Sequence, residues 1–369
     1  FSYLWKMLTG GLAGSSVDDM AAVFGANNAN PLTLGFWSTL VTLLTMLIVG
    51  KGVQKGIEKS VSWMMPGLVI MLVVLIGFGL FSGGFGAAVN FLFSFNAGSL
   101  SSEGLLAALG HAFFTLSLAS GAILTYGSYL PKEASIGRTT LSVAVADTVV
   151  ALMAGLAIFP VIFANGMNPG QGPGLIFMSL PLAFQAMPLG TLFGILFFLM
   201  LSMAALTSAI SMVEATVSWL CDNKGLSRPA AAWGTGIVLW LISTLAMLSF
   251  NLGAEWTLAD KTFFDWLDYL TSRWMMPLGG LGMVVLAGFV LKSATFREEL
   301  GLSPLPYALW LAMVRYVSPL GIVVIFVDAL GIYQVSFAAH WPWLLAILVV
   351  MAALGESLSP RLRSALRAV

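Results

Sequence analysis

Small and hydroxyl-bearing residues interrupt one long apolar stretch of the chain. The stretch Glu103–Leu130 is longer than the roughly 20 residues that one helical membrane crossing needs. Its centre reads Leu-Ser-Leu-Ala-Ser-Gly over 116–121. Small residues and Gly121 permit a helix break, and the freed backbone groups could bind a ligand. Helix–helix packing through small residues explains the same pattern, so both interpretations stay open.

A second group of oxygen-bearing residues lies in the apolar stretch Leu189–Leu220. Ala204, Thr207 and Ser208 are spaced i, i+3 and i+4, so they share one helix face. Hard cations bind oxygen, which hydroxyls and loosened carbonyls supply. The pattern therefore predicts either a sodium site or a packing face whose hydroxyls bond back to their own helix.

Ionisable residues within apolar stretches are costly and need a partner or water. Asp147 shares its stretch with small residues, which suits a cation site, although it could also meet water at the end of the span. Glu214 could hold helices together or take part in transport chemistry. His111 is more typical of a hydrogen-bonded interior residue than of a ligand.

Two acids stand near the end of a later stretch. Asp265 and Asp268 share a helix face and Arg273 follows them. They form either a solvated interfacial cluster or a charged gate.

Composition places these residues in a membrane. Charged residues make up 9% of the chain, against about 25% in a soluble globular protein, and mean hydropathy is +0.96. The net charge of zero gives no reason to expect a nucleic-acid partner. Cys221 is the single cysteine, so no internal disulfide can form.

Apolar runs of suitable length predict an all-α polytopic membrane protein with the lipid bilayer as its solvent. The predicted spans are Thr33–Gly50, Ser60–Phe81, Glu103–Leu130, Thr139–Ala164, Leu189–Leu220, Ala230–Phe250, Phe263–Leu291, Leu305–Leu330 and a short Trp341–Glu356. The stretch Phe1–Gly14 resembles the end of a further helix, and we expect the chain to be a fragment without its N-terminus.

The connections between spans alternate in charge. Lysine and arginine occur in alternate connections and in the tail, at Lys51, Lys55, Lys59, Lys132, Arg138, Lys224, Arg228, Lys292, Arg297, Arg361, Arg363 and Arg367. The opposite set contains Lys261 alone. By the positive-inside rule the basic set and the C-terminus are cytoplasmic, in a multi-pass inner (plasma) membrane protein. We also expect residues 166–188 to contain a re-entrant or surface helix on the outer side, and the region from Asp18 to Asn27 to be an exterior loop.

Four segments resemble the LeuT-type neurotransmitter:sodium symporter family. FFTLSLASGAILTYGSYL (113–130) is similar to its unwound sixth helix, and AALTS (204–208) to the sodium-binding part of its eighth. KGIEKSVSWMMPGL (55–68) is similar to the loop into its fifth helix, and RYVSP (315–319) to its eleventh. The resemblance thus extends over nearly the whole chain.

The resemblance implies two five-helix inverted repeats in a single membrane transport domain spanning 1–369. Residues 1–14 would end helix 3, 33–81 would form helices 4–5 and 103–291 would form the complete second repeat, helices 6–10. Residues 305–356 would form helices 11–12, and 357–369 a cytoplasmic tail. Helices 1, 2 and most of 3 would be lacking.

The resemblance also implies roles for individual residues. Sodium would bind Thr115 and Asp147 at one site and Ala204, Thr207 and Ser208 at another. The amino-acid substrate would contact Phe114, Thr115, Ser117, Ser120, Gly121, Ser208 and Met212. Phe114 and Asp268 would belong to an outer gate, and Tyr129 and Asp222 to a cytoplasmic gate.

The chain departs from the family pattern at some of these positions. The family usually has asparagine at the position of Asp147, often has glutamine at that of His111, and LeuT-type members can carry a bulky aromatic at that of Ser120. Ser120 predicts a pocket for large hydrophobic or aromatic amino acids. Asp147 predicts a built-in anion, so that chloride is not required. The oligomeric state is left open.

Two other function classes compete with sodium-coupled transport. An intramembrane hydrolase could use His111 with Ser117 or Ser120, but six residues place His111 and Ser117 on nearly opposite helix faces. A non-coupled, channel-like protein is disfavoured by a broken helix combined with hydroxyl groups suited to sodium. Sodium-coupled amino-acid transport, without enzymatic activity, is the function that the sequence predicts.

Overall fold

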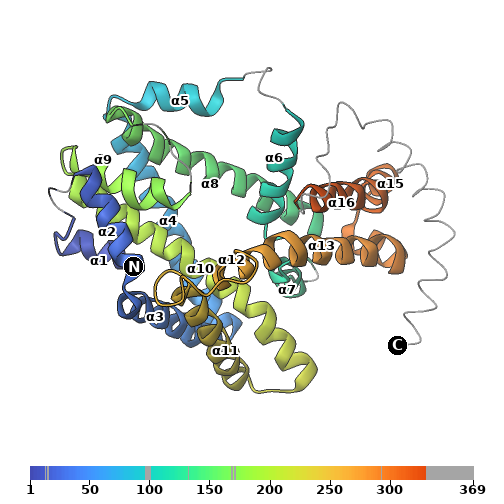
Figure 1. Ribbon diagram of the computed structural model, residues 1–369. Helices are drawn as coiled ribbons and strands as arrows, with labels where there is room; N and C mark the ends of the chain where they lie inside the picture. The colour runs from blue at the N-terminus through green and yellow to red at the C-terminus, as the bar shows by residue number, and fades with distance from the viewer. Residues whose placement is uncertain are drawn as a thin grey trace. The chain divides into compact units, whose positions relative to one another are not determined.

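The computed structural model describes residues 1–12, 14, 16–95, 101–131, 133–167, 169, 172–291 and 293–329. The chain divides into two compact units, which are described separately: Phe1–Phe95 with Thr148–Asp265, and Asn96–Asp147 with Trp266–Val369. Within the described residues every regular element is a helix, and one isolated bridge joins Leu258 to Lys261 (Figure 1). The prediction of an all-α protein is confirmed.

Seven helical segments of the described chain are long and apolar enough to cross a membrane. Each overlaps one of the predicted spans. They are Pro31–Gly50, Val53–Leu80, Ile136–Ala164, Gly190–Lys224, Arg228–Leu248, Phe263–Val290 and Pro304–Asp328. The predicted span Trp341–Glu356 and the predicted tail 357–369 lie outside the described residues.

The first unit is built around one long helix, α10. Its elements are α1 (Ser2–Leu8), α2 (Val17–Ala29), α3 (Pro31–Gly50), η1 (Val53–Glu58), α4 (Lys59–Leu80), α5 (Phe85–Phe93), the later part of α8 (Ile136–Ala164), η3 (Leu175–Ser179), α9 (Leu180–Gln185), α10 (Gly190–Lys224) and α11 (Arg228–Leu248). Helix α10 packs against α1, α3, α4, α9 and α11. Phe184, Phe197 and Phe198 are fully buried in its core, so aromatic packing fixes α10 in this unit.

The expected exterior loop from Asp18 to Asn27 is wrong, because these residues form α2. A capping box starts the helix: Asp19 accepts bonds from the Ser16 N–H at 2.8 Å and the Ser16 hydroxyl at 2.7 Å, while Ser16 Oγ accepts from the Asp19 N–H. These bonds hold the pKa of Asp19 below its usual value. Ser2 donates to Asn27 at 2.7 Å and satisfies a polar side chain inside the unit. Polar composition alone had suggested a loop, but local capping made it a helix.

The expected helix within 166–188 is confirmed as η3 and α9. Leu180, Ala183 and Phe184 are fully buried against the first unit's core. The apolar surface of this short segment is therefore covered by protein.

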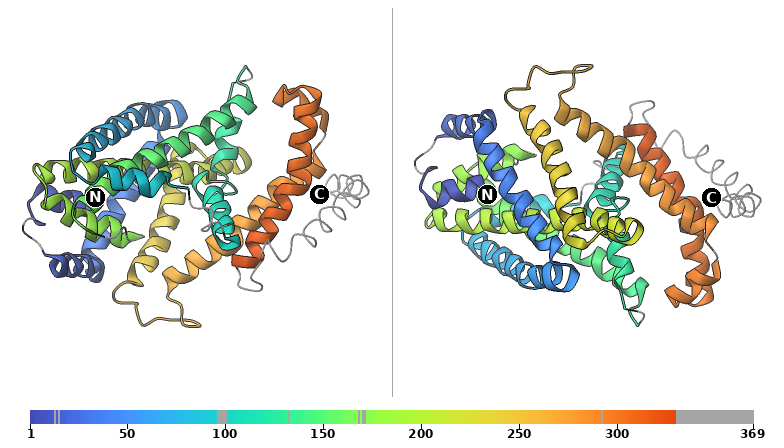
Figure 2. Two further views of the ribbon diagram at one scale, coloured as in Figure 1. Left: turned by 90° about the horizontal axis from the view of Figure 1, so that it is seen from above. Right: turned by 90° about the horizontal axis from the view of Figure 1, so that it is seen from below.

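The second unit contains the helix that had been predicted to break. Its elements are α6 (Ser102–Thr115), α7 (Ala122–Ser128), the start of α8, η4 (Tyr269–Met275), α13 (Met276–Val285), η5 (Leu286–Val290), α14 (Ser293–Leu300), α15 (Pro304–Ala312), η6 (Met313–Val317) and α16 (Ser318–Ala329). Helix α12 (Phe263–Asp268) leads into η4 and crosses the division between the units. Helices α13 and α16 lie side by side (Figure 2). Three of these elements are π-helical turns, which frequently mark functional sites.

Candidate ion and substrate site

The backbone is not helical between α6 and α7. Helix α6 ends at Thr115 and α7 begins at Ala122. Ser117, Ala119 and Gly121 have positive φ angles of 51°, 70° and 84°. A left-handed conformation is uncommon for serine and alanine and ordinary for glycine. The predicted helix break is confirmed at the predicted residues.

The break leaves backbone groups available. In the described part of the chain, the N–H groups of residues 119–121 donate no hydrogen bond. Two side chains support the connection: Ser120 donates to the Ser117 carbonyl at 2.8 Å, and Thr125 donates to the Gly121 carbonyl at 3.0 Å. An unpaired N–H group binds an anion readily when water is excluded.

Glycines on α13 let the break pack closely. A Cβ on Gly279 would lie 3.2 Å from the Ala119 carbonyl oxygen, and one on Gly280 would collide with the Phe113 ring. A Cβ on Gly282 would meet nothing within 4 Å. The packing and ligand-binding interpretations of the small residues are thus compatible, because packing against α13 holds the break in place.

Thr115 and Asp147 meet beside the break. The Thr115 hydroxyl donates to the Asp147 carboxylate at 3.2 Å, across 32 positions of sequence. Asp147 is half-buried on α8 and Thr115 is the last residue of α6. The Thr115 hydroxyl and the Asp147 carboxylate, at the end of a helix, offer oxygen ligands of the kind that a hard cation binds.

Helix α10 presents its oxygens differently. The Ala204 carbonyl accepts bonds from the Thr207 hydroxyl at 2.9 Å and the Ser208 hydroxyl at 3.1 Å, so three oxygens gather on one face of an unbroken helix. Ser208 and Met212 are exposed within the first unit, whereas Leu206 and Ile210 on the opposite face are buried.

The same bonding pattern recurs on α11. There the Trp240 carbonyl accepts from the Ser243 hydroxyl at 3.0 Å and the Thr244 hydroxyl at 2.7 Å. Hydroxyls that bond back to their own helix therefore do not identify an ion site by themselves. Ser243 and Thr244 of α11 can therefore serve as control positions for Thr207 and Ser208 of α10.

Glu214 is fully buried and forms an ion pair with Arg228. Arg228 also donates its Nε to the Val49 carbonyl at 3.1 Å. The pair joins α10, the start of α11 and the end of α3, so the structural interpretation of Glu214 is the one that the contacts support. Sequence reasoning had assigned Arg228 only to a basic connection. The sequence signal for this ion pair was an acid within one span and an arginine at the start of the next helix.

The predicted outer-gate residues lie near a cavity in the second unit. The cavity has a volume of about 250 Å³ and is lined by Phe113, Phe114, Ser272, Arg273 and neighbouring apolar residues. Ser272 donates to Asp268 at 3.1 Å. Asp265 instead caps α12 by accepting from the Thr262 N–H at 3.0 Å, which fits the solvated interpretation of that acid.

The predicted cytoplasmic-gate residues lie in different units. Tyr129 contacts the Tyr126 ring, with the ring centroids 6.4 Å apart. Asp222 accepts from the Ser218 hydroxyl at 3.2 Å. The predicted substrate contacts divide in the same way: Ser208 and Met212 lie in the first unit, and Phe114, Thr115, Ser117, Ser120 and Gly121 in the second.

The hydrolase arrangement does not form in the described residues. His111 is exposed. Ser120 donates to a backbone carbonyl of its own loop, and no bond joins His111 to Ser117 or Ser120 there.

Comparison with known proteins decides the class of this chain. The family model described as "Sodium:neurotransmitter symporter family" matches residues 29–363. The chain belongs to this family. It is therefore a multi-pass membrane transporter and not an enzyme, and the break with its oxygen-bearing neighbours lies in a protein of the sodium-dependent class.

Individual relatives agree with this assignment. A sodium-dependent transporter of Bacillus subtilis, YhdH, is 35% identical over 89% of this chain and 74% of the relative. One from Haemophilus influenzae is 33% identical over 82% of this chain, which spans 66% of that relative. The structure of MhsT matches with a TM-score of 0.79 and 37% identity, over 89% of this chain and 75% of MhsT. That crystal structure is a complex with L-phenylalanine. The LeuT-like fold is thus confirmed.

Proposed function

We propose that this protein carries an amino acid across the membrane by sodium-coupled symport with alternating access. The observation that carries the proposal is the break at 116–121 with the Thr115–Asp147 bond beside it. Broken helices at mid-membrane depth present N–H groups to anions and carbonyls to cations. An amino acid carries one group of each sign, so such a break can hold both of its ends.

Two sodium positions follow from the oxygen groups. One sodium ion binds the Thr115 hydroxyl and the Asp147 carboxylate. A second binds the Ala204 carbonyl with the hydroxyls of Thr207 and Ser208. Each set contains oxygens about 3 Å apart, a spacing that modest side-chain rotation converts from mutual hydrogen bonding to shared coordination.

The substrate is a hydrophobic or aromatic amino acid. The unpaired N–H groups of 119–121 receive its carboxylate, and Phe114, Ser117 and Ser120 line the space for its side chain. The small Ser120 leaves room for a large side chain. Support comes from the L-phenylalanine complex of MhsT and from the Drosophila ananassae "Sodium-dependent nutrient amino acid transporter 1", which is 31% identical over 170 residues.

Gates and orientation complete the proposal. Phe114 and Asp268 close the outer side, and Tyr129 and Asp222 belong to the cytoplasmic side. The basic connections and the C-terminus face the cytoplasm of a cell whose plasma (inner) membrane holds the protein, because translocation disfavours lysine and arginine in short connections.

Asp147 removes the need for chloride. A carboxylate about 4 Å from a sodium ion, at an effective dielectric constant near 20, attracts it by about 4 kcal/mol. This attraction offsets part of the cost of desolvating both charges.

The test is uptake of radiolabelled leucine and phenylalanine into proteoliposomes that contain the whole transporter. An inward sodium gradient should drive accumulation above the external concentration, and potassium should not replace sodium. Unlabelled Trp, Tyr and Leu should compete better than Ala or Gly, and gluconate should replace chloride without loss. Equilibration without accumulation would indicate a channel-like protein and contradict symport. Strong chloride dependence would contradict only the role of Asp147.

A further inference from the structure

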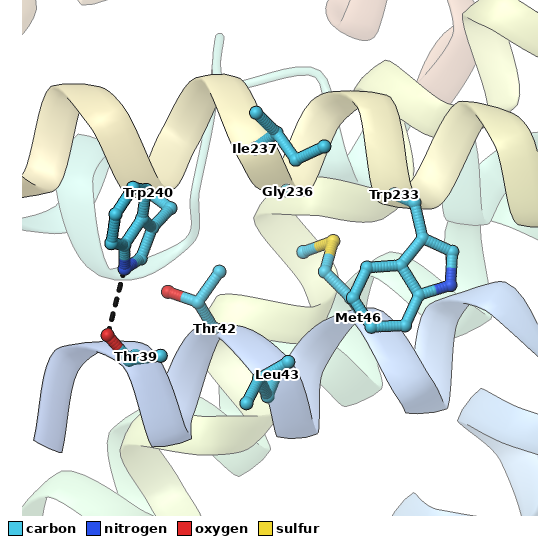
Figure 3. A pocket seen from close by; sticks show the side chains of 8 residues that line it. All are labelled: Thr39, Thr42, Leu43, Met46, Trp233, Gly236, Ile237 and Trp240. Carbon is cyan, nitrogen blue, oxygen red and sulfur yellow. Dashed lines mark hydrogen bonds between the residues drawn. The ribbon is translucent and has the colours of Figure 1, made fainter. Parts of the chain in front are cut away.

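An apolar groove lies between α3 and α11, and no residue of α10 lines it. It has a volume of about 260 Å³ and is lined by Thr39, Thr42, Leu43, Met46, Trp233, Gly236, Ile237 and Trp240 (Figure 3). An apolar cavity of about 150 Å³ already holds a benzene ring. The groove therefore has room for several methylene groups of a chain.

The polar side chains of Thr39, Thr42 and Trp240, which line the groove, are paired within the protein. The indole N–H of Trp240 donates to the Thr39 hydroxyl at 2.8 Å, the bond drawn dashed in Figure 3. The Thr42 hydroxyl donates to the Ser38 carbonyl at 2.9 Å. An occupant of this groove gains nothing by bringing hydrogen-bonding groups and loses their hydration. The apolar lining of the groove therefore favours a hydrocarbon chain as its occupant.

Both walls of the groove are membrane-spanning helices. Leu43 is 40% exposed and Ile237 57% exposed within the described residues. The close approach of α3 and α11 continues to Gly50, where an added Cβ would lie 3.6 Å from the Ala232 side chain. Met46 and Trp233 are the last residues that line the groove on this side.

One end of the groove is suited to a phospholipid headgroup. Trp233 lies five residues from the first residue of α11, or roughly 7.5 Å along the axis, a depth where indoles collect at membrane interfaces. Lys51 caps the same end of α3 and is exposed. Lys55 and Lys59 follow it, and Glu58 is the single acid in 51–59. Among the described residues, no hydrogen bond or ion pair is formed by the side-chain ammonium groups of these lysines.

We propose that the α3–α11 groove binds an acyl chain of an anionic phospholipid, from the leaflet at the Lys51 end, with the headgroup beside Lys51. Three features favour this occupant: the groove is apolar, its threonine hydroxyls and the Trp240 indole are already paired, and lysines lie at one of its ends. The site is separate from the oxygen groups of the proposed transport pathway, and its test does not depend on transport.

The experiment uses phosphatidylglycerol with a diazirine in one acyl chain, mixed into nanodiscs that hold the whole protein. After irradiation, mass spectrometry maps the lipid adducts. We expect adducts concentrated on the residues of α3 and α11 that line the groove. Ile237→Trp, which fills the groove, should remove most of them. Val238→Trp is the matched control, because Val238 is 55% exposed on the same helix but does not line the groove.

The headgroup is tested with unlabelled competitors. Phosphatidylglycerol should displace the photoactive lipid better than phosphatidylcholine, and Lys51→Gln should reduce this preference by about fivefold. Lys59→Gln, at the start of α4, should reduce it less. Equal labelling in the wild type and Ile237→Trp would overturn the acyl-chain site. Adducts no denser on the groove residues than on Val238 and Leu241, which are exposed on α11 outside the groove, would overturn it as well. Equal displacement by both lipids would overturn the anionic headgroup.

Discussion

The break between α6 and α7 and the continuous helix α10 both present oxygen atoms, but they do so by different means. At the break the backbone leaves the helical conformation, and residues 119–121 keep N–H groups without acceptors in the described structure. On α10 the backbone stays helical, and only the hydroxyls of Thr207 and Ser208 add to the Ala204 carbonyl. The break therefore presents polar groups through its main-chain conformation, whereas α10 does so through its side chains.

The two regions are also held in place differently. Helix α10 is fixed by buried aromatic packing and by the Glu214–Arg228 ion pair. The break is fixed by close contact with Gly279 and Gly280 of α13. We infer that charge loss will affect α10 mainly through stability, whereas added volume at α13 will affect the break mainly through function.

The largest expected effect is on the ion pair. Glu214→Ala leaves Arg228 without its buried partner and should lower the free energy of unfolding by about 3–5 kcal/mol. Thermal unfolding in detergent measures the loss. Glu255→Ala, at an exposed acid, should stay within about 0.5 kcal/mol of the wild type. A small loss at Glu214 would show that the pair does not hold α10.

The next prediction tests whether close packing of α13 shapes the break, apart from the stability of α13 itself. Gly280→Ala forces the Phe113 ring to move and should lower the uptake rate about tenfold, equivalent to about 1.4 kcal/mol. Gly282→Ala, on the same helix with open space around it, should keep wild-type uptake. Equal rates in both variants would mean that the contact with α13 does not shape the break.

The third prediction concerns the sodium dependence of uptake and tests the oxygen atoms of α10. Thr207→Val combined with Ser208→Ala should raise the sodium concentration for half-maximal uptake about tenfold, since two ligand hydroxyls are lost. The control is Ser243→Ala with Thr244→Val, which removes the same bonding pattern at Trp240. Unchanged sodium dependence in the α10 variant would contradict the assignment of Thr207 and Ser208 as sodium ligands.

The smallest effect concerns the charge at the break. Asp147→Asn keeps a carbonyl oxygen near Thr115 but removes the fixed anion. In chloride buffer uptake should fall only a few-fold, in line with losing one charge-assisted interaction. In gluconate it should fall further, so that chloride dependence appears while sodium dependence remains. Chloride-independent uptake by Asp147→Asn would show that another group balances the sodium charge.

Much of this molecule follows from local sequence. Long apolar runs must become helices in a bilayer, because no other open structure satisfies the backbone there. The break was also predictable, since small residues and Gly121 interrupt a stretch too long for one crossing, and glycine adopts positive φ angles readily. Helix α2 shows the limit of composition: a polar stretch looked like a loop, whereas Ser16 and Asp19 cap a helix.

Which residues meet was decided by the tertiary structure. The family resemblance suggested Thr115 and Asp147 as one site, but the hydrogen bond between them depends on how α8 lies beside α6. The partner of Glu214 could not be selected from the many basic residues by spacing. The groove between α3 and α11 likewise exists only because two distant spans pack with Thr39 facing Trp240 and Met46 facing Gly236. Periodicity and capping act within a few residues, whereas contacts between distant helices are selected by packing over the whole unit.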